Sequence, residues 1–124
     1  MPGVRGFARI ASRIAGALLT IGLIALSLGA AAAELIMFDQ PGCPWCARWD
    51  REIAPIYPKT ELGRRSPLRR VDIRATRPED LKAITGVRYT PTFVLVDGGA
   101  EIGRIVGYLG EEQFWSLLQE LFDR

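Results

Sequence analysis

The chain contains only two cysteines, Cys43 and Cys46, which enclose Pro44 and Trp45 and follow closely on the apolar run Leu35–Phe38. A continuous apolar run of this length is typical of a strand that is buried on both faces of a sheet. Pro44 suits the first turn of a helix, where its missing N–H costs no hydrogen bond. The sequence therefore predicts a buried strand that leads through a short loop into a helix that begins at the cysteine pair.

The position of the two thiols on that helix predicts different roles for them. A thiol at the N-terminus of a helix meets the positive end of the helix dipole and unpaired N–H groups, both of which favour its thiolate. We expect Cys43 to be the exposed nucleophile that attacks a partner's disulfide, and Cys46, one turn further along, to resolve the mixed disulfide. Pro44 and Trp45 would set the stiffness and apolar character of the turn. Both are candidate substrate-binding residues, and we expect the Trp45 ring to contact a partner. A reversible redox disulfide, Cys43–Cys46, with no other cofactor, is the leading hypothesis.

Two other roles for the cysteine pair remain open at this stage. A purely structural disulfide is one, but cysteines that close so short a loop remove little entropy from the unfolded chain. A metal-handling module that uses both thiolates is the other. It would need further ligands from carboxylates or from a second molecule, because the chain contains no histidine.

The charge of the chain is divided unevenly between its N-terminus and the remainder. The formal net charge is +2, but the first 33 residues contain Arg5, Arg9 and Arg13 and no acidic residue. From Glu34 onward, 13 Lys or Arg face 14 Asp or Glu. This balance gives no support to nucleic-acid binding, which depends on a basic surface.

The same N-terminal region has the pattern of an export signal. Its arginines lead into the apolar stretch 14–33, which ends in Ala31, Ala32 and Ala33. A basic region, an apolar region and small residues at a cleavage site are typical of a signal peptide. We therefore predict a signal peptide over residues 1–33, or alternatively an uncleaved membrane anchor, because about 20 apolar residues span a bilayer. The domain from 34 to 124 would then lie in the periplasm or outside the cell.

Beyond Glu34 the apolar pattern alternates between strand-like and helix-like segments. After the first strand and helix, we expect a strand over 68–73, a short helix that begins at a capping box (76–79) and ends at Gly86, a hairpin of strands 92–96 and 101–108, and an amphipathic helix with its stripe over 114–122. Six arginines lie near the second strand: 64, 65, 69, 70, 74 and 77. They fit a sheet edge guarded by charge, or a docking site for an acidic partner. The order β-α-β-α-β-β-α predicts one compact α/β domain.

This order resembles the thioredoxin superfamily, and two motifs carry the resemblance. One is the Cys-x-x-Cys pair at the first strand-to-helix junction, and the other is Tyr89-Thr90-Pro91-Thr92 at the start of the third strand. The resemblance implies a minimal thioredoxin fold, with a four-stranded mixed sheet flanked by helices. It also implies a cis peptide bond at Pro91 that lies against the cysteine turn, a backbone at Thr90 that contacts substrate, and space for a partner beside Gly107.

One departure from that family concerns the handling of protons. Cytoplasmic thioredoxins carry a buried acid in the strand before the cysteines, whereas Met37 stands at the corresponding position here. Asp39, Asp50 or a water molecule would have to accept the proton of Cys46, and the sequence does not distinguish among them.

Within the superfamily, the pattern Pro-Gly-Cys-Pro-x-Cys-Ala-x-Trp together with Tyr-Thr-Pro-Thr resembles the SoxS type of bacterial sulfur-oxidation systems. That resemblance implies a periplasmic thiol-disulfide reductase that keeps a sulfur-carrier protein reduced and takes electrons from a membrane thiol transporter. We expect it to be a monomer. A disulfide-forming oxidant and a cytochrome-maturation thioredoxin are the alternatives within the same chemistry.

Overall fold

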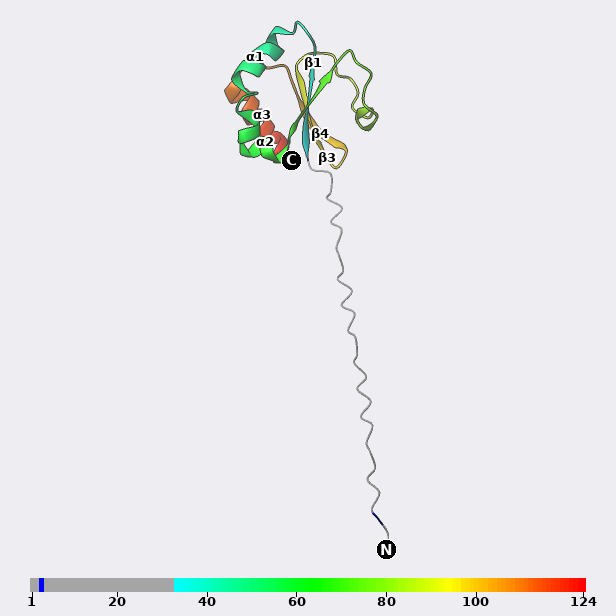
Figure 1. Ribbon diagram of the computed structural model, residues 1–124. Coiled ribbons are helices and arrows are strands. Elements are labelled where there is room, and N and C mark those ends of the chain that lie inside the picture. Colours follow the sequence, from blue (N-terminus) through cyan, green and yellow to red (C-terminus); the bar gives the residue numbers. More distant parts are fainter. Residues whose placement is uncertain (1–2, 4–32) are drawn as a thin grey trace.

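The computed structural model describes residue 3 and residues 33–124. Residues 33–124 form a mixed sheet of four strands with helices (Figure 1). The strands lie in the order β2-β1-β3-β4, with β1 parallel to β2, β1 antiparallel to β3, and β3 antiparallel to β4. Their bounds are Glu34–Asp39 for β1, Leu68–Asp72 for β2, Thr92–Asp97 for β3 and Ala100–Val106 for β4. The predicted α/β fold class is thereby confirmed.

The predicted signal peptide or anchor lies outside the described residues, apart from residues 3 and 33. Among the helices that the structure describes, none is both long and apolar enough to cross a membrane.

The two faces of the sheet are covered differently, as Figure 1 shows. Helices α1 (Pro44–Glu52), α2 (Glu61–Arg65) and α3 (Glu111–Phe122) lie on one face. The segment 73–91, which has little regular structure, lies on the other. Successive side chains of β1 point to opposite faces of the sheet and so enter two hydrophobic cores. Leu35 and Met37 face the helices, and Ile36 and Phe38 face the segment 73–91.

An aromatic cluster holds α1, the helix that begins at the cysteines, against the sheet. Trp49 of α1 is fully buried, and its ring centroid lies 5.2 Å from that of Phe93 on β3 and 5.7 Å from that of Phe114 on α3. Trp49 is thus a core residue that packs α1 on the sheet and on α3. Phe114, Leu118 and Leu121 are also buried, as the amphipathic stripe of α3 predicted. These contacts fix the start of α1 relative to β1 and β3.

The helix predicted to run from the capping box to Gly86 is wrong in type. Only the short 3-10 helix η2 (Glu79–Leu81) forms there, and Pro78 at its N-cap makes no side-chain capping bond. Leu81 and Ile84 are both buried, and the N–H of Ile84 bonds the Leu81 carbonyl with the i+3 spacing of a 3-10 turn. The carbonyl of Ile84 accepts a hydrogen bond from Arg77. So short a segment gains more from burying these two side chains than from a marginal α-helix.

Two helical turns that the sequence did not predict come before β2. The 3-10 helix η1 (Tyr57–Lys59) leads into α2, where the Thr60 side chain caps the helix by accepting a hydrogen bond from the Gly63 N–H at 3.0 Å. A Cβ on Gly63 would lie 1.7 Å from the Tyr57 carbonyl oxygen, so only glycine fits at this position. Pro55 and Pro58 interrupt the apolar periodicity, so the pattern did not predict a helix here. Thr60 followed by the acidic Glu61 was the sequence signal for the start of α2.

The arginines near β2 guard an edge of the sheet. β2 is an edge strand, and its arginines pair with carboxylates of the same domain: Arg69 with Asp80, and Arg70 with Asp39 and Asp50. The others are also engaged internally: Arg74 pairs with Asp72, Arg65 lies over the Phe122 ring, Arg77 lies over the Phe38 ring and Arg64 donates to the Lys59 carbonyl. Internal pairing of this kind favours edge protection over docking of an acidic partner.

Candidate active site

The cysteine pair forms a disulfide at the N-terminus of α1. Cys43 is the N-cap residue, Pro44 is the first helical residue, and the N–H of Cys46 donates to Cys43 Sγ at 3.1 Å. The Cα atoms of the bonded cysteines lie 5.3 Å apart. A sulfur atom thus occupies the capping position that usually belongs to an oxygen, where a thiolate would receive the same backbone donor.

Both cysteines are largely covered in this oxidised state. Cys43 is 8% exposed and Cys46 is 4% exposed, so Cys43 is the more accessible residue but less open than the sequence suggested. The surrounding core, which includes Trp49 and Tyr108, covers the remainder. The disulfide therefore offers only a small accessible surface.

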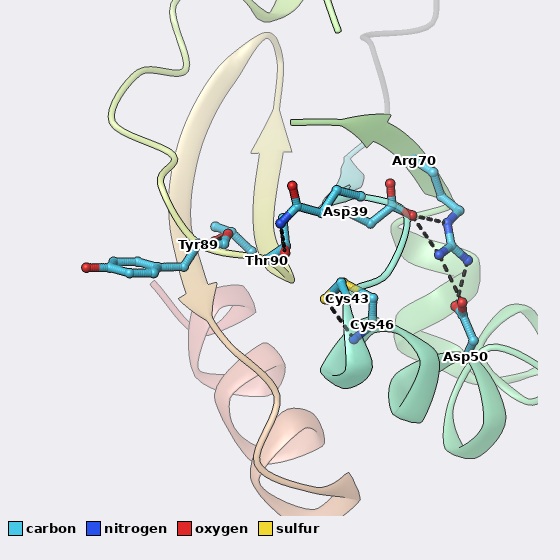
Figure 2. Close-up of a disulfide and its surroundings, with 9 residues drawn as sticks. Asp39, Cys43, Cys46, Asp50, Arg70, Tyr89 and Thr90 are labelled. Carbon is cyan, nitrogen blue, oxygen red and sulfur yellow. Dashed lines mark hydrogen bonds and ion pairs between the residues drawn. A yellow bond between two sulfur atoms is a disulfide. The ribbon is translucent and has the colours of Figure 1, made fainter. Parts of the chain in front are cut away.

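The predicted substrate-side residues come together beside the disulfide. The Thr90–Pro91 peptide bond is cis, as the resemblance implied, and the Gln40 side chain donates to Thr90 Oγ1 at 3.2 Å (Figure 2). The Pro91 carbonyl accepts a hydrogen bond from the Gly107 N–H at 2.7 Å. Gly107 has a φ of +84°, and a Cβ there would meet no atom within 4 Å. The structure thus joins Thr90, Pro91 and Gly107, with open space above Gly107.

Large apolar side chains are exposed on the segments that meet at this side of the disulfide. We call Trp45, Tyr89, Val106 and Leu109 the apolar rim; each is between 52% and 73% exposed. Trp45 lies between the cysteines, Tyr89 precedes Thr90, and the other two flank Gly107 and Tyr108. The Tyr89 ring points outward, away from the disulfide (Figure 2). Large exposed apolar side chains on neighbouring segments are a feature of surfaces that bind another molecule.

A charged cleft of about 430 Å³ lies on the other side of the disulfide. Its lining includes both cysteines, Asp39, Asp50 and Arg70. Arg70 donates to Asp39 Oδ2 through Nε at 2.8 Å and makes a two-pronged contact with Asp50, with distances of 2.7 and 3.1 Å. These hydrogen bonds, first among them the bond to Asp50, raise the pKa of Arg70. In Figure 2 Arg70 and Asp50 lie to the right of the disulfide, and Thr90 lies to its left.

The comparisons with known proteins agree with this geometry. The sequence pattern of the thioredoxin-like domain family matches residues 28–122. The chain belongs to the thioredoxin superfamily. With its dithiol at the start of α1, this thioredoxin-like protein is a thiol-disulfide oxidoreductase. No curated protein sequence matches the chain.

Three solved structures are similar to it. The periplasmic thioredoxin SoxS from Paracoccus pantotrophus, in its reduced form, is 50% identical with a TM-score of 0.69, over 72% of this chain and 94% of that one. A thioredoxin of Malassezia sympodialis, Mala s 13, is 23% identical with a TM-score of 0.54, over 72% and 76% of the two chains. Oxidised thioredoxin O2 of Arabidopsis thaliana is 20% identical with a TM-score of 0.54, over 73% and 75%. The last two show the shared fold alone.

The sequence did not predict the contacts among Arg48, Glu52 and Tyr108. The Tyr108 hydroxyl donates to Glu52 Oε2, and Arg48 Nε donates to Glu52 Oε1 at 2.8 Å. The hydrogen bond from Tyr108, followed by the bond from Arg48, lowers the pKa of Glu52, and burial is the main factor that raises the pKa of Tyr108. The group ties the loop of Gly107 to α1. No local pattern pairs Glu52 with a tyrosine 56 positions away.

The buried strand position before the cysteines holds no acid. Met37 is fully buried in the helix-facing core, which leaves the carboxylates of the charged cleft as the acids near Cys46. Within the residues that the structure describes, no group of three or more His, Cys, Asp or Glu is arranged to hold a metal ion.

Proposed function

We propose that this protein is a periplasmic thiol-disulfide reductase that acts on a protein disulfide or mixed disulfide, with Cys43 attacking and Cys46 resolving. The observation that carries the proposal is the placement of the Cys43–Cys46 disulfide beside the cis-proline loop and the apolar rim. The 50% identity to a periplasmic thioredoxin supports the location, and so does the predicted signal peptide.

The chemistry proceeds in two balanced steps. The Cys43 thiolate attacks one sulfur of the substrate disulfide, a mixed disulfide forms, and the second substrate sulfur leaves as a thiolate. The Cys46 sulfur then attacks Cys43 Sγ and releases the first substrate sulfur. Two electrons pass from the dithiol to the substrate, and the protein ends in the disulfide form described above.

The open space at Gly107 and the rim indicate how a substrate would lie. An extended segment can pass over Gly107, pair with the backbone at Thr90 and cover Trp45 with apolar side chains. Because apolar area drives such contacts, we expect substrates whose cysteine is flanked by apolar or small residues.

The resemblance to the SoxS type supports more specific partners. We propose a sulfur-carrier protein as the substrate and a membrane thiol transporter as the electron donor, with this protein acting as a monomer. No metal or organic cofactor is required, because the dithiol supplies both electrons.

Trapping with Cys46→Ser tests this function. The variant retains the attacking thiol and should stall as a mixed disulfide that a reducing gel dissolves, and a periplasmic extract of the source organism should yield a sulfur-carrier protein. Cys43→Ser is the matched control and should trap nothing. Equal trapping by both variants would contradict the assigned roles.

The redox potential tests the direction of electron flow. Equilibration of the wild type with glutathione buffers should give a potential below that of the glutathione couple, as a reductase requires. A potential well above that couple would make the protein an oxidant instead.

A further inference from the structure

We propose that Asp39 accepts the proton of Cys46 during the resolving step, and that Arg70 is the positioning residue that orients its carboxylate. The proposal rests on the dithiol exchange assigned above. It starts from the charged cleft, which Cys46 and Asp39 line together and which is roomy enough for bridging water.

Three carboxylates line this cleft, and their contacts distinguish Asp39 from the other two. Asp50 gives both oxygens to Arg70, and Asp72 accepts from the backbone N–H and side chain of Arg74. Asp39 binds Arg70 through Oδ2 alone, and in the described part of the chain no hydrogen bond reaches its Oδ1. Its side chain is also the least exposed of the three, at 20% against 39% and 38%. Asp39 therefore combines a fixed orientation with a free acceptor atom.

The position of Asp39 in the fold suits this role. It is the last residue of β1, and Gln40, Pro41 and Gly42 connect it to Cys43 along the wall of the same cleft. Arg70 reaches it from the neighbouring edge strand β2 and anchors on Asp50 of α1. The carboxylate is thus held by contacts that join β1, β2 and α1, and α1 begins at the disulfide.

The proton balance of the step is as follows. In the mixed disulfide, Cys46 carries a proton that must leave as its sulfur bonds to Cys43 Sγ. The proton passes to Asp39 Oδ1, directly or through a cleft water, and then to solvent, while the departing substrate thiolate takes a proton from solvent. The transfer coincides with the attack, because the Cys46 sulfur gives up its proton as its bond to Cys43 Sγ forms.

Simple charge repulsion would have the opposite effect. The charged groups that line the cleft with Cys46 are Asp39, Asp50, Asp72 and Arg70, so carboxylates outnumber the cation. If Asp39 acted only through its charge, its removal would lower the pKa of Cys46 and speed the attack. If Asp39 accepts the proton, its removal slows the attack. The sign of the effect distinguishes the two.

Rapid mixing of the reduced protein with excess 5,5′-dithiobis(2-nitrobenzoate) tests the proposal. Attack by Cys43 releases the first thionitrobenzoate, and attack by Cys46 on the resulting mixed disulfide releases the second. For Asp39→Asn we expect an unchanged first release and a second release at least about tenfold slower at pH 7. In Asp39→Asn the second release should then rise with pH up to about 8.5, where an ordinary thiol ionises, and should depend on pH more steeply than in the wild type.

Asp72→Asn is the matched control, because it removes the same charge from the same cleft. It should leave the second release within about twofold of the wild type, the scale of a partly exposed charge. An unchanged or faster second release in Asp39→Asn would overturn the proposal, as would equal slowing in both variants. A missing first release would instead indicate loss of Cys43 reactivity or of folding. In that case Asp39→Ala with added acetate decides: acetate restores the second release if a carboxylate is what the step lacks, and no response to acetate overturns the proposal.

Discussion

The two sides of the disulfide differ in whether their side chains are exposed to solvent or paired within the domain. On the rim side, Trp45, Val106 and Leu109 present apolar surface to solvent. On the cleft side, Asp39 and Asp50 are paired with Arg70 inside the domain. Exposed apolar side chains are stabilised when a partner covers them, whereas charged groups already paired within the domain gain no stability from a partner. The contrast fits the proposed roles, with recognition at the rim and proton handling in the cleft.

The division also fits the order of events in thiol-disulfide exchange. Cys43 has the greater exposure of the pair, as the proposed attack on a partner requires. In the proposed second step Cys46 needs no partner contact, because its target is Cys43 Sγ within the same turn. Each sulfur thus has the surroundings that its own step requires.

The largest expected effect comes from removing the rim in Trp45→Ala/Leu109→Ala. We expect kcat/KM for insulin disulfides to fall about 10- to 100-fold, because burial of a large apolar side chain contributes about 1.5 to 3 kcal/mol. The rate with a small aromatic disulfide should change less than about twofold, since it needs little of the rim. Ile56→Ala is the control, an exposed apolar residue beyond the far end of α1. Equal losses on both substrates would remove the contrast between the two sides.

Gly107→Ala should reduce protein reduction by about five- to tenfold by occupying the space above Gly107. Its positive φ also predicts a loss of about 1 kcal/mol in the free energy of unfolding. Gly98→Ala is matched in backbone cost, because Gly98 has a φ of +59° in the hairpin turn and no atom within 4 Å of its Cβ position. Urea unfolding should show similar losses for both variants, and insulin reduction a loss for Gly107→Ala alone. Similar activities would show that no substrate passes over Gly107.

Arg70→Met sharpens the contrast from the cleft side. Without the guanidinium, Asp39 and Asp50 lose their shared partner, and we expect a loss of about 1 kcal/mol in the free energy of unfolding. The loss should shrink in 1 M salt, which screens like charges. The second thionitrobenzoate release should slow about two- to threefold as the orientation of Asp39 is lost, with the KM for insulin unchanged. A raised KM would place part of recognition in the cleft.

The smallest expected effect is that of Glu52→Gln, which weakens the link between Tyr108 and α1. Because the pKa of Glu52 is lowered by folding, its ionised form stabilises the protein at neutral pH. That contribution is fully present above the ordinary glutamate pKa of about 4.3 and is lost as pH falls through the lower folded value. The melting temperatures of wild type and variant should therefore differ at pH 7 and converge toward pH 3. A constant difference would show that Glu52 acts through packing alone.

The positions of the chemical groups could be predicted well where local rules apply. The apolar run before the cysteines gave β1, Pro44 gave the start of α1, and Asp97 with Gly98 gave the hairpin, because strand periodicity, proline geometry and turn chemistry act over a few residues. The helix predicted over 76–86 was wrong, because burial of Leu81 and Ile84 against the sheet outweighed the helical pattern of the segment.

The sequence by itself determined that two thiols stand one helical turn apart at the end of a buried strand, because apolar periodicity and proline geometry act locally. Only the tertiary structure decided which groups surround those thiols. Arg70 contacts Asp39 because β2 pairs with β1, and it contacts Asp50 because α1 packs on the sheet. Tyr108 likewise contacts Glu52 at the end of α1. Such contacts join residues 20 to 56 positions apart. Their geometry depends on how whole elements pack, which no local pattern encodes.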